Sequence, residues 1–190
     1  MDSKQELRSR LRRLRREYAE ALPDNMRGLM FMRPPRLVMD HLPARATIGV
    51  YRSNSFEAPA SAYARFFLEA GHDIALPWFA GRESGMEFRA WTDPFGDTDL
   101  EMGPYGILQP AGDARQLAPD TVFVPLLGFT ADGQRLGQGG GHYDRWLAAH
   151  PDTIAIGLAW DCQLLDSLPV EPHDRPLAAV ITPTRLFGAL

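Results

Sequence analysis

The segment GQRLGQGGGHYDRWL, residues 133–147, combines five glycines with arginine, tyrosine and aspartate. Glycine loses more backbone freedom on folding than other residues, so such a run is kept where the backbone bends sharply or approaches another group closely. Backbone N–H groups in a glycine loop that leads into a helix can bind an anion, because the helix dipole adds positive potential. Arg135 would add a forked, charged donor for a phosphate. A loop that only packs against its neighbours is the alternative, and glycine content does not decide between them.

Three common glycine motifs do not match this segment. A phosphate-binding loop of the form G-x-x-x-x-G-K-[ST] needs a Gly-Lys pair, which the sequence lacks. A dinucleotide-binding G-x-G-x-x-G that starts at Gly137 would need glycine where His142 stands. A β-hairpin turn would need strands on both sides, whereas HYDRWLAA is typical of a helix. We therefore predict a loop between a buried strand and a helix.

Two aspartates are candidate metal ligands. Asp144 follows the glycines, and a carboxylate beside a bound phosphate would repel it unless a cation lies between them. Mg²⁺ held by one or two carboxylates and by phosphate oxygens would resolve this conflict. Asp174, in EPHDRP (171–176), is the second candidate. Helix capping by Asp144 and an ordinary loop position for Asp174 are the alternatives.

The elements around these residues predict an α/β fold with a largely parallel sheet. Strands are expected at 46–53, 73–78, 86–91, 121–129, 153–160 and 177–182, and helices at 3–21, 58–70 and 143–149. A further helix at 26–41 is interrupted by Pro34-Pro35. The connection at 92–119 is long enough to predict a functional or disordered loop. We find no repeat and no second domain, so residues 1–190 are expected to form one domain.

The helix expected at 3–21 carries most of the local positive charge. Ser3 and Glu6 form an S-x-x-E capping box, and Leu7, Leu11, Leu14 and Tyr18 fall on one face. Residues 1–20 hold seven basic and four acidic side chains, a net charge of +3, while the whole chain has −4. A basic helix on an acidic protein indicates an anionic partner. RNA is one candidate, although the helix lacks interleaved aromatic residues and no RNA-binding motif occurs.

Composition limits the class of protein further. The chain has 190 residues, of which 45% are hydrophobic, so it can bury a core without disulfide bonds. Its single cysteine, Cys162, excludes an internal disulfide and suits a reducing cytoplasm. No apolar run is long enough to span a membrane. We expect a cytoplasmic monomer without a membrane partner.

Several segments together resemble the 5-formyltetrahydrofolate cyclo-ligases, also called 5,10-methenyltetrahydrofolate synthetases. VFVPLLGFTADGQRLGQGGGHYDRWLA resembles that family's strand followed by R-L-G-x-G-x-G-Y-Y-D-R, and KQELRSRLRRLRR resembles its N-terminal basic helix. GILQP (106–110) resembles its G-I-x-E-P segment, and IGLAWDCQLLDSLPVEPHDRPLAAVIT its C-terminal block. The resemblance covers nearly the whole chain in order. It implies a Rossmann-like fold related to sugar-phosphate isomerases and CoA transferases.

The resemblance also implies a reaction. ATP and 5-formyltetrahydrofolate would give 5,10-methenyltetrahydrofolate, ADP and phosphate, with Mg²⁺. The formyl oxygen would take the γ-phosphate, and N10 would attack the formyl carbon as phosphate leaves. An ATP-dependent kinase or transferase with a non-folate substrate is the alternative, because fold alone does not fix function.

The site residues follow from the resemblance position by position. ATP would be bound by Lys4, Arg8, Arg135, Gly137, Gly139, Gly140, Gly141, His142 and Tyr143. The folate would be bound by Glu57, Arg52, Gln138 and the glycines at 139–141, and Mg²⁺ by Asp144 and Asp174. Arg135 and Tyr143 would be catalytic.

Other positions are less directly implied. His142 and Gln109 depart from the family, which has tyrosine and, in many members, glutamate there. Phe88 and Trp91 are candidates for stacking on the pterin, with a place in the core as the alternative. Most of the remaining arginines of the basic helix are expected to be solvated or paired with the acidic body, with attraction of a folate's polyglutamate tail as the alternative for some; they are Arg10, Arg12, Arg13, Arg15 and Arg16.

Overall fold

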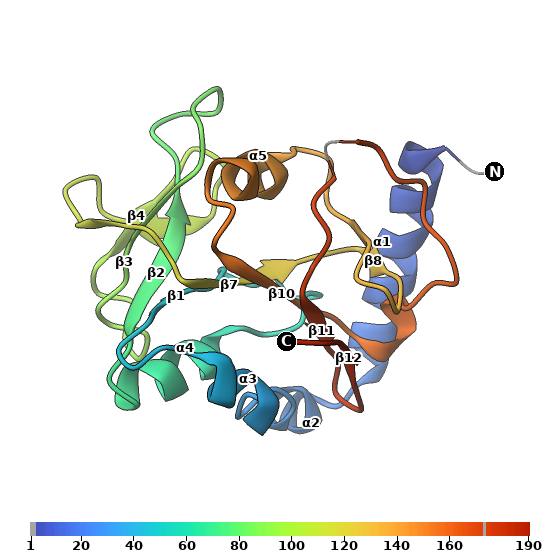
Figure 1. Ribbon diagram of the computed structural model, residues 1–190, viewed down its shortest axis with the longest axis horizontal. Coiled ribbons are helices and arrows are strands. Elements are labelled where there is room, and N and C mark those ends of the chain that lie inside the picture. The colour runs from blue at the N-terminus through green and yellow to red at the C-terminus, as the bar shows by residue number, and fades with distance from the viewer. Residues whose placement is uncertain (1–2, 173) are drawn as a thin grey trace.

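The computed structural model describes residues 3–172 and 174–190, and in that part of the chain an eight-stranded sheet forms the centre (Figure 1). The strand order is β12-β11-β10-β7-β1-β2-β3-β6. The five inner strands are parallel: β1 (Thr47–Gly49), β2 (Asp73–Trp78), β7 (Thr121–Pro125), β10 (Ile154–Leu158) and β11 (Ala179–Ile181). The outer strands β3 (Glu87–Ala90), β6 (Gln116–Leu117) and β12 (Leu186–Gly188) are antiparallel to their neighbours. The predicted α/β fold with a largely parallel sheet is confirmed.

Both faces of this sheet are covered. Phe123 of β7 packs with α4 (Ser61–Glu69), whereas Val122 and Val124 pack with α5 (His142–Ala149). In Figure 1, α5 lies on one side of the sheet, and α2 (Asp24–Leu29), α3 (Arg36–His41) and α4 lie on the other. A strand buried on both faces explains the continuous apolar run in its sequence. Phe88 and Trp91 are buried in these two cores, as the alternative to pterin stacking predicted.

Helix α1 (Lys4–Ala21) begins as predicted but buries a different face. Ser3 accepts a hydrogen bond from the Glu6 N–H, and the Glu6 carboxylate accepts one from the Ser3 N–H, so the capping box is confirmed. The buried positions are Leu7, Leu11, Arg15 and Ala19, which are spaced four apart. Leu14 is 38% exposed and Arg15 only 4%, so the predicted position of Leu14 on the buried face is wrong. Arg15 is buried because it finds polar partners inside the protein, described below.

Some elements differ from those predicted. The helix expected at 26–41 is two short helices, α2 and α3, on either side of Pro34-Pro35. The connection at 92–119 contains a hairpin of β4 (Leu100–Met102) and β5 (Leu108–Pro110), followed by β6. Strand β12 and the 3-10 helix η1 (Asp161–Gln163) were not predicted. Elements of two or three residues are too short to show a hydrophobic period.

The glycine segment begins in a hairpin after all. The strand expected at 121–129 ends at Pro125, and β8 (Gly128–Phe129) pairs with β9 (Arg135–Leu136) in a separate two-stranded sheet. Gly133 lies in the turn between them, so the exclusion of a hairpin was wrong for this end of the segment. The other end leads into α5, as predicted. The hairpin thereby fixes where Arg135 enters the site.

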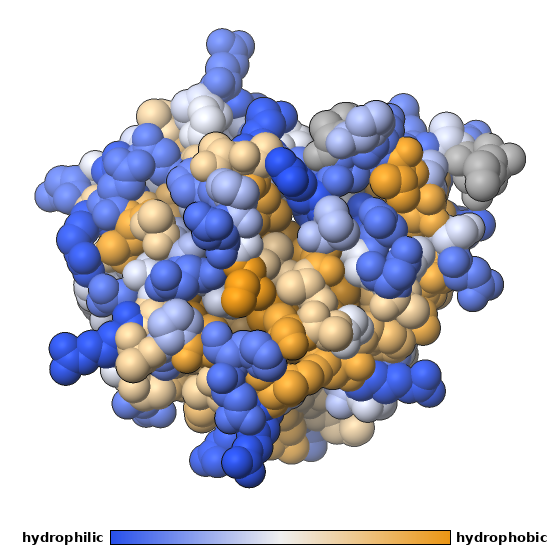
Figure 2. Space-filling model, in the orientation of Figure 1, coloured by the Kyte–Doolittle hydropathy of each residue, from blue (hydrophilic) through white to orange (hydrophobic). Residues whose placement is uncertain are grey.

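No helix in the described residues is long and apolar enough to cross a membrane. Figure 2 shows the face that carries β12, where hydrophilic residues surround an apolar centre. Exposed apolar side chains also occur at the end of α2, where Leu29 is its last residue, and shortly after it at Met32. Such a mixture is ordinary for a protein surface.

Gly133 should be essential for the stability of the β8–β9 hairpin. Its φ is +88°, and a Cβ there would collide with the carbonyl oxygen of Leu177. We expect Gly133→Ala to lower the free energy of unfolding by about 2–4 kcal/mol. Gly28→Ala is the control, because a Cβ at Gly28 meets no atom within 4 Å and alanine favours helix α2. Urea unfolding of both variants measures the difference, and equal stabilities would contradict this role.

Candidate functional site

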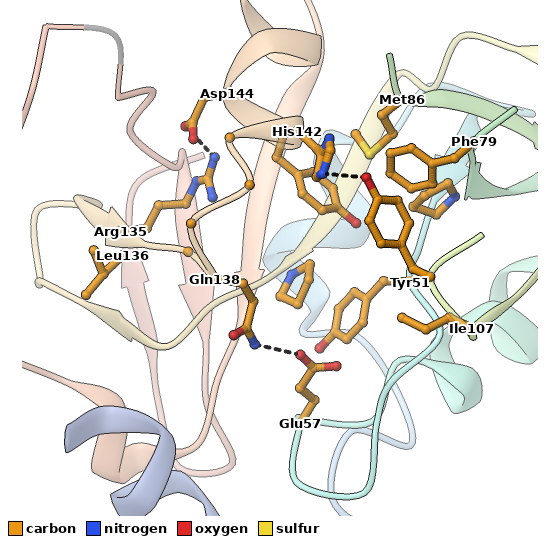
Figure 3. Close-up of a pocket in the computed structure, with 18 of the residues that line it drawn as sticks. Tyr51, Glu57, Phe79, Met86, Ile107, Arg135, Leu136, Gln138, His142 and Asp144 are labelled. Carbon is orange, nitrogen blue, oxygen red and sulfur yellow. Dashed lines mark hydrogen bonds and ion pairs between the residues drawn. The ribbon is translucent and has the colours of Figure 1, made fainter. Parts of the chain in front are cut away.

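A cavity of about 530 Å³ lies at the carboxyl ends of β1, β2 and β7. Tyr51 and Arg52 follow β1, Phe79 follows β2, and Pro125 ends β7; all four line the cavity. Ligands of open α/β sheets bind in this position, outside the carboxyl ends of parallel strands. Figure 3 shows side chains from both halves of the chain directed into it.

Every site residue predicted from the sequence lines this one cavity. From the N-terminal half these are Lys4, Arg8, Arg52 and Glu57, and from the C-terminal half Arg135, Gly137, Gln138, Gly139, Gly140, Gly141, His142, Tyr143, Asp144 and Asp174. Phe79, Met86, Tyr105 and Gln109 also line it. The fold therefore brings together residues up to 170 positions apart in the sequence.

The loop at 137–141 presents free backbone donors to the cavity. Gly139 has a φ of +111° and Gly141, the N-cap of α5, a φ of +63°, a region that disfavours residues with a Cβ. Within the described part of the chain, the N–H groups of residues 138–141 donate no hydrogen bond to a protein atom. Unpaired amides at a helix N-terminus are suited to bind an anion.

Two arginines of α1 donate hydrogen bonds to this loop. The Arg8 Nε donates to the Gly137 carbonyl over 3.1 Å. The Arg12 guanidinium donates to the backbone carbonyl of Gln138 over 3.0 Å and to its side-chain oxygen over 3.1 Å. Arg12 is exposed and Arg15 pairs with Glu57, as expected for these arginines, but both also contact residues of the site. Arg13 does lie at the surface, where it pairs with Glu17.

Three ion pairs involve the cations Arg135 and Lys4 that line the cavity. Arg135 donates to the Asp144 carboxylate over 2.6 Å (Figure 3), and Lys4 lies 2.8 Å from both Asp174 and Glu171. The Arg135 side chain is only 4% exposed, and its Nε has no partner among the described residues. An oxygen atom of a ligand could accept a hydrogen bond from such a buried donor.

The surroundings shift the pKa values of these cations in opposite directions. Burial lowers the pKa of Arg135, and the neighbouring Asp144 carboxylate opposes that effect. Burial would also lower the pKa of Lys4, but its hydrogen bonds to Asp174 and Glu171 outweigh burial and raise it. The Lys4 ammonium group therefore stays charged at neutral pH, as a phosphate ligand would require.

The acidic residues fit a metal ion that is bound by protein carboxylates and by phosphate oxygens together. Asp144 and Asp174 line the same cavity, and carboxylate oxygens are the ligands that Mg²⁺ prefers. Among the described residues, no group of three or more His, Cys, Asp or Glu side chains forms a metal site. A magnesium ion here would thus take further ligands from phosphate and water, which is its usual behaviour.

An aromatic wall closes the side of the cavity opposite the ion pairs. The His142 ring packs edge-on against Phe79 at 4.9 Å, and Tyr105 packs against both. The Gln109 side chain accepts a hydrogen bond from the Phe79 N–H over 3.1 Å and donates one to the Phe79 carbonyl over 3.2 Å. An ionised glutamate could not make the second bond, so the departure at Gln109 has a structural use.

Burial raises the pKa of Tyr143, and the Glu57 charge raises it further. The phenol of Tyr143 is therefore protonated at neutral pH, a form that could donate a hydrogen bond but could not act as a base.

Arg52 has partners of its own in the protein. Its guanidinium donates to Asp97 over 2.9 Å and lies 5.5 Å from the Trp91 ring centre.

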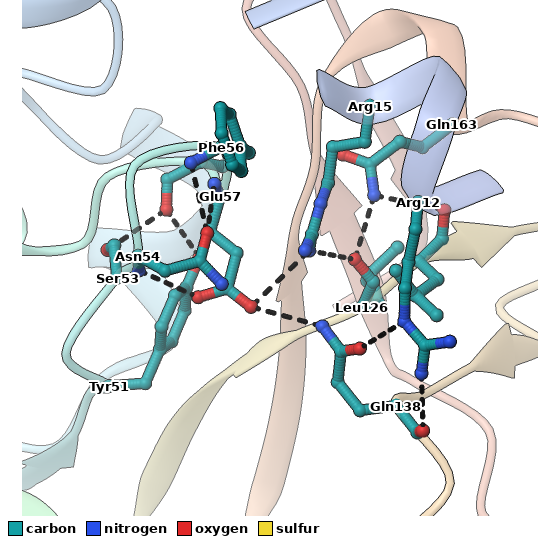
Figure 4. A network of polar contacts seen from close by, with 12 residues as sticks. Arg12, Arg15, Tyr51, Ser53, Asn54, Phe56, Glu57, Leu126, Gln138 and Gln163 are labelled. Carbon is teal, nitrogen blue, oxygen red and sulfur yellow. Dashed lines mark hydrogen bonds and ion pairs between the residues drawn. The ribbon is translucent and has the colours of Figure 1, made fainter. Parts of the chain in front are cut away.

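Glu57 is held by three donors. Its Oε1 accepts from Arg15 over 3.3 Å and from Gln138 over 3.4 Å, and its Oε2 accepts from the Asn54 N–H over 3.0 Å (Figure 4). Arg15 was not predicted as a site residue. Its signal was its place four residues after Leu11, in the buried stripe of α1, where a charged residue needs an internal partner.

Comparison with known proteins places these features in one family. The model of the 5-formyltetrahydrofolate cyclo-ligase family matches residues 1–183. The 5-formyltetrahydrofolate cyclo-ligase of Escherichia coli K12 is 34% identical over 187 residues, covering 95% of this chain and 98% of the relative. The mouse enzyme of the same name is 26% identical over 187 residues, covering 93% and 89%.

Solved structures share the fold. The 5,10-methenyltetrahydrofolate synthetase of Aquifex aeolicus matches with a TM-score of 0.72 and 23% identity, over 97% of this chain and 92% of that one. The Mycoplasma pneumoniae enzyme of that name matches with a TM-score of 0.67 and 22% identity, over 95% and 98%. Sequence and structure agree, and this chain belongs to the 5-formyltetrahydrofolate cyclo-ligase family.

Proposed function

We propose that this protein catalyses the ATP-dependent cyclisation of 5-formyltetrahydrofolate to 5,10-methenyltetrahydrofolate, with release of ADP and phosphate. The observation that carries the proposal is the joining of two unlike halves in one cavity. Free loop amides with Arg135 and Lys4 form a half suited to phosphates, and Glu57 with the aromatic wall forms a half suited to a pterin. The family named for this reaction supports it.

The triphosphate would lie between the glycine loop and helix α1. The amides of residues 138–141 would donate to phosphate oxygens, and Lys4 and Arg8, which lie four apart on α1, would add positive charge. The buried Arg135 Nε would find its partner in a phosphate oxygen. His142 and Tyr143 would border the nucleotide at the start of α5.

Asp144 and Asp174 would hold Mg²⁺ beside these phosphates. A bound Mg²⁺ would supply positive charge against the phosphate oxygens and align them for transfer. In the structure, Arg135 pairs with Asp144 and Lys4 pairs with Asp174. When the nucleotide binds, both cations would turn to phosphate oxygens and both carboxylates to Mg²⁺, so each charge would keep a partner of opposite sign.

The chemistry would proceed in two steps. The formyl oxygen attacks the γ-phosphorus, a new O–P bond forms, and the bond to the β-phosphate oxygen breaks to release ADP. N10 then attacks the formyl carbon, loses its proton to solvent, and displaces phosphate as the ring closes. Arg135 would stabilise the charge on the transferring phosphoryl group, and the neutral Tyr143 phenol would donate a hydrogen bond near the reacting atoms.

The folate would occupy the half of the cavity that contains Glu57. A carboxylate can accept N–H donors of a pterin ring, and Arg52 and Gln138 line the same cavity. Phe79, which Gln109 fixes through its backbone, offers an apolar face on the opposite wall.

Neither alternative is favoured. Arg8, Arg12 and Arg15 bind the protein itself, which leaves less of α1 for RNA. Nothing in the cavity favours a non-folate substrate.

We also propose that the chain acts as one catalytic domain, as a monomer and in the cytoplasm. Burial raises the pKa of its one thiol, Cys162, to about 11, so that group stays protonated at neutral pH.

A direct assay tests the function. Purified protein is mixed with 5-formyltetrahydrofolate, ATP and Mg²⁺, and the absorbance of the methenyl product is followed together with phosphate release. We expect product and phosphate in equal amounts. Omission of ATP is the control. No product with a folded protein, or product without ATP, would contradict the proposal.

Asp144→Asn tests the metal assignment. We expect the Mg²⁺ concentration for half-maximal activity to rise at least about tenfold, because a neutral amide is a weaker magnesium ligand. Asp152→Asn is the matched control, since Asp152 is exposed and away from the cavity. An unchanged Mg²⁺ dependence in Asp144→Asn would show that Asp144 does not hold the metal.

Gln109→Glu tests the bridge to Phe79. At neutral pH the buried carboxylate cannot donate to the Phe79 carbonyl, so we expect the free energy of unfolding to fall by about 1–3 kcal/mol. The KM for the folate should rise as well, because the wall it contacts is loosened. Gln116→Glu, at an exposed position of β6, should change neither quantity. Equal behaviour of the two variants would exclude the bridge.

A further inference from the structure

We infer that Arg15 and Gln138 are positioning residues that hold the Glu57 carboxylate in the orientation in which it accepts the pterin. The inference rests on the proposed function, which assigns Glu57 to the folate. Neither residue needs to touch the substrate for this role. Both act through the Glu57 oxygen Oε1 (Figure 4).

Arg15 fixes the Glu57 carboxylate from the interior of the protein. Its guanidinium is buried, and one nitrogen donates both to Glu57 and to the Leu126 carbonyl, each over 3.3 Å. Gln163 of η1 donates to that same carbonyl over 2.8 Å, so the position of Leu126 is itself fixed. A buried ion pair with these additional bonds is expensive to rearrange. Arg15 therefore sets where Oε1 lies.

Gln138, which lies in the glycine loop, is the second residue that fixes the Glu57 carboxylate. Its amide nitrogen donates to Glu57 Oε1, and its amide oxygen accepts from Arg12. Because the oxygen is bound to Arg12, the nitrogen must face Glu57. The side chain is thus oriented at both ends, although Gln138 is exposed overall.

The donors leave Glu57 with capacity for one further partner. A carboxylate offers about four acceptor positions, of which Arg15, Gln138 and the Asn54 N–H use three. Both positions of Oε1 are used, so the remaining one is on Oε2. The side chain is 10% exposed and lines the cavity, which directs that position to a ligand rather than to bulk solvent. A carboxylate fixed in this way binds without losing further side-chain entropy.

Gln138→Met tests the inference, because methionine keeps the length of the side chain and removes both hydrogen bonds. We expect the KM for 5-formyltetrahydrofolate to rise about fivefold to tenfold, with kcat and the KM for ATP within about twofold of wild type. An unchanged folate KM would overturn the role of Gln138. A rise in the KM for ATP instead would also overturn it, since the loop rather than Glu57 would then be affected.

A double-mutant cycle separates positioning from direct contact with the folate. If Gln138 acts through Glu57, Gln138→Met should add less than about twofold in a Glu57→Gln background. Independent, multiplied effects would show that Gln138 binds the substrate itself. Should Glu57→Gln leave the folate KM unchanged, the inference fails while cyclisation activity can stand. Absence of activity in the wild type would instead reject the proposed function.

Arg15→Lys examines the other side. Lysine keeps the positive charge but lacks the planar, forked guanidinium, so Glu57 should lose its fixed orientation. We expect the folate KM to rise about fivefold or more, with a circular dichroism spectrum like that of wild type. Arg13→Lys is the control on the exposed side of the same helix, where Arg13 pairs only with Glu17 among the described residues. Equal folate KM values for the two variants would overturn the role of Arg15.

Discussion

A buried charge must be paired, and three ion pairs determine how the walls of this cavity meet. They are Lys4 with Asp174, Arg15 with Glu57, and Arg135 with Asp144. Two of the cations come from α1, so this helix joins the segment after β1 to the segment before β11. The third joins the β8–β9 hairpin to α5. Together with the hydrogen bonds from Arg8 and Arg12 to the glycine loop, these pairs connect segments that are far apart in the sequence.

The same pairs would allow one small site to bind both a triphosphate and a metal, as we propose. In the free protein, carboxylates serve as partners for Lys4 and Arg135. Phosphates are stronger partners, and the carboxylates they displace need a new cation. Magnesium would provide it, so we expect nucleotide and metal to bind together rather than independently. The Arg15–Glu57 pair would not be exchanged and would offer the folate a fixed carboxylate (Figure 4).

The sequence predicts the longer elements of the fold and the residues that line the cavity, but it does not predict the short elements. The capping box, the strand at 73–78 and the helix after the glycines were correct because each has a strong local signal. The β4–β5 and β8–β9 hairpins were missed, since their strands are two or three residues long and are fixed by long-range packing. Arg15 was missed for a related reason. Its place in the buried stripe of α1 was a signal for burial, but its partner Glu57 lies 42 positions away in the sequence and is known only from the structure.

We propose that the unpaired amides of residues 138–141 bind the triphosphate. The most direct measurement is an NMR titration of backbone amide resonances with Mg²⁺ and a non-hydrolysable ATP analogue. Our account predicts that the largest shifts fall on Gly139, Gly140 and Gly141, with smaller ones at Lys4 and Arg8. Saturable shifts confined to another part of the protein, with the glycine resonances unchanged, would contradict it.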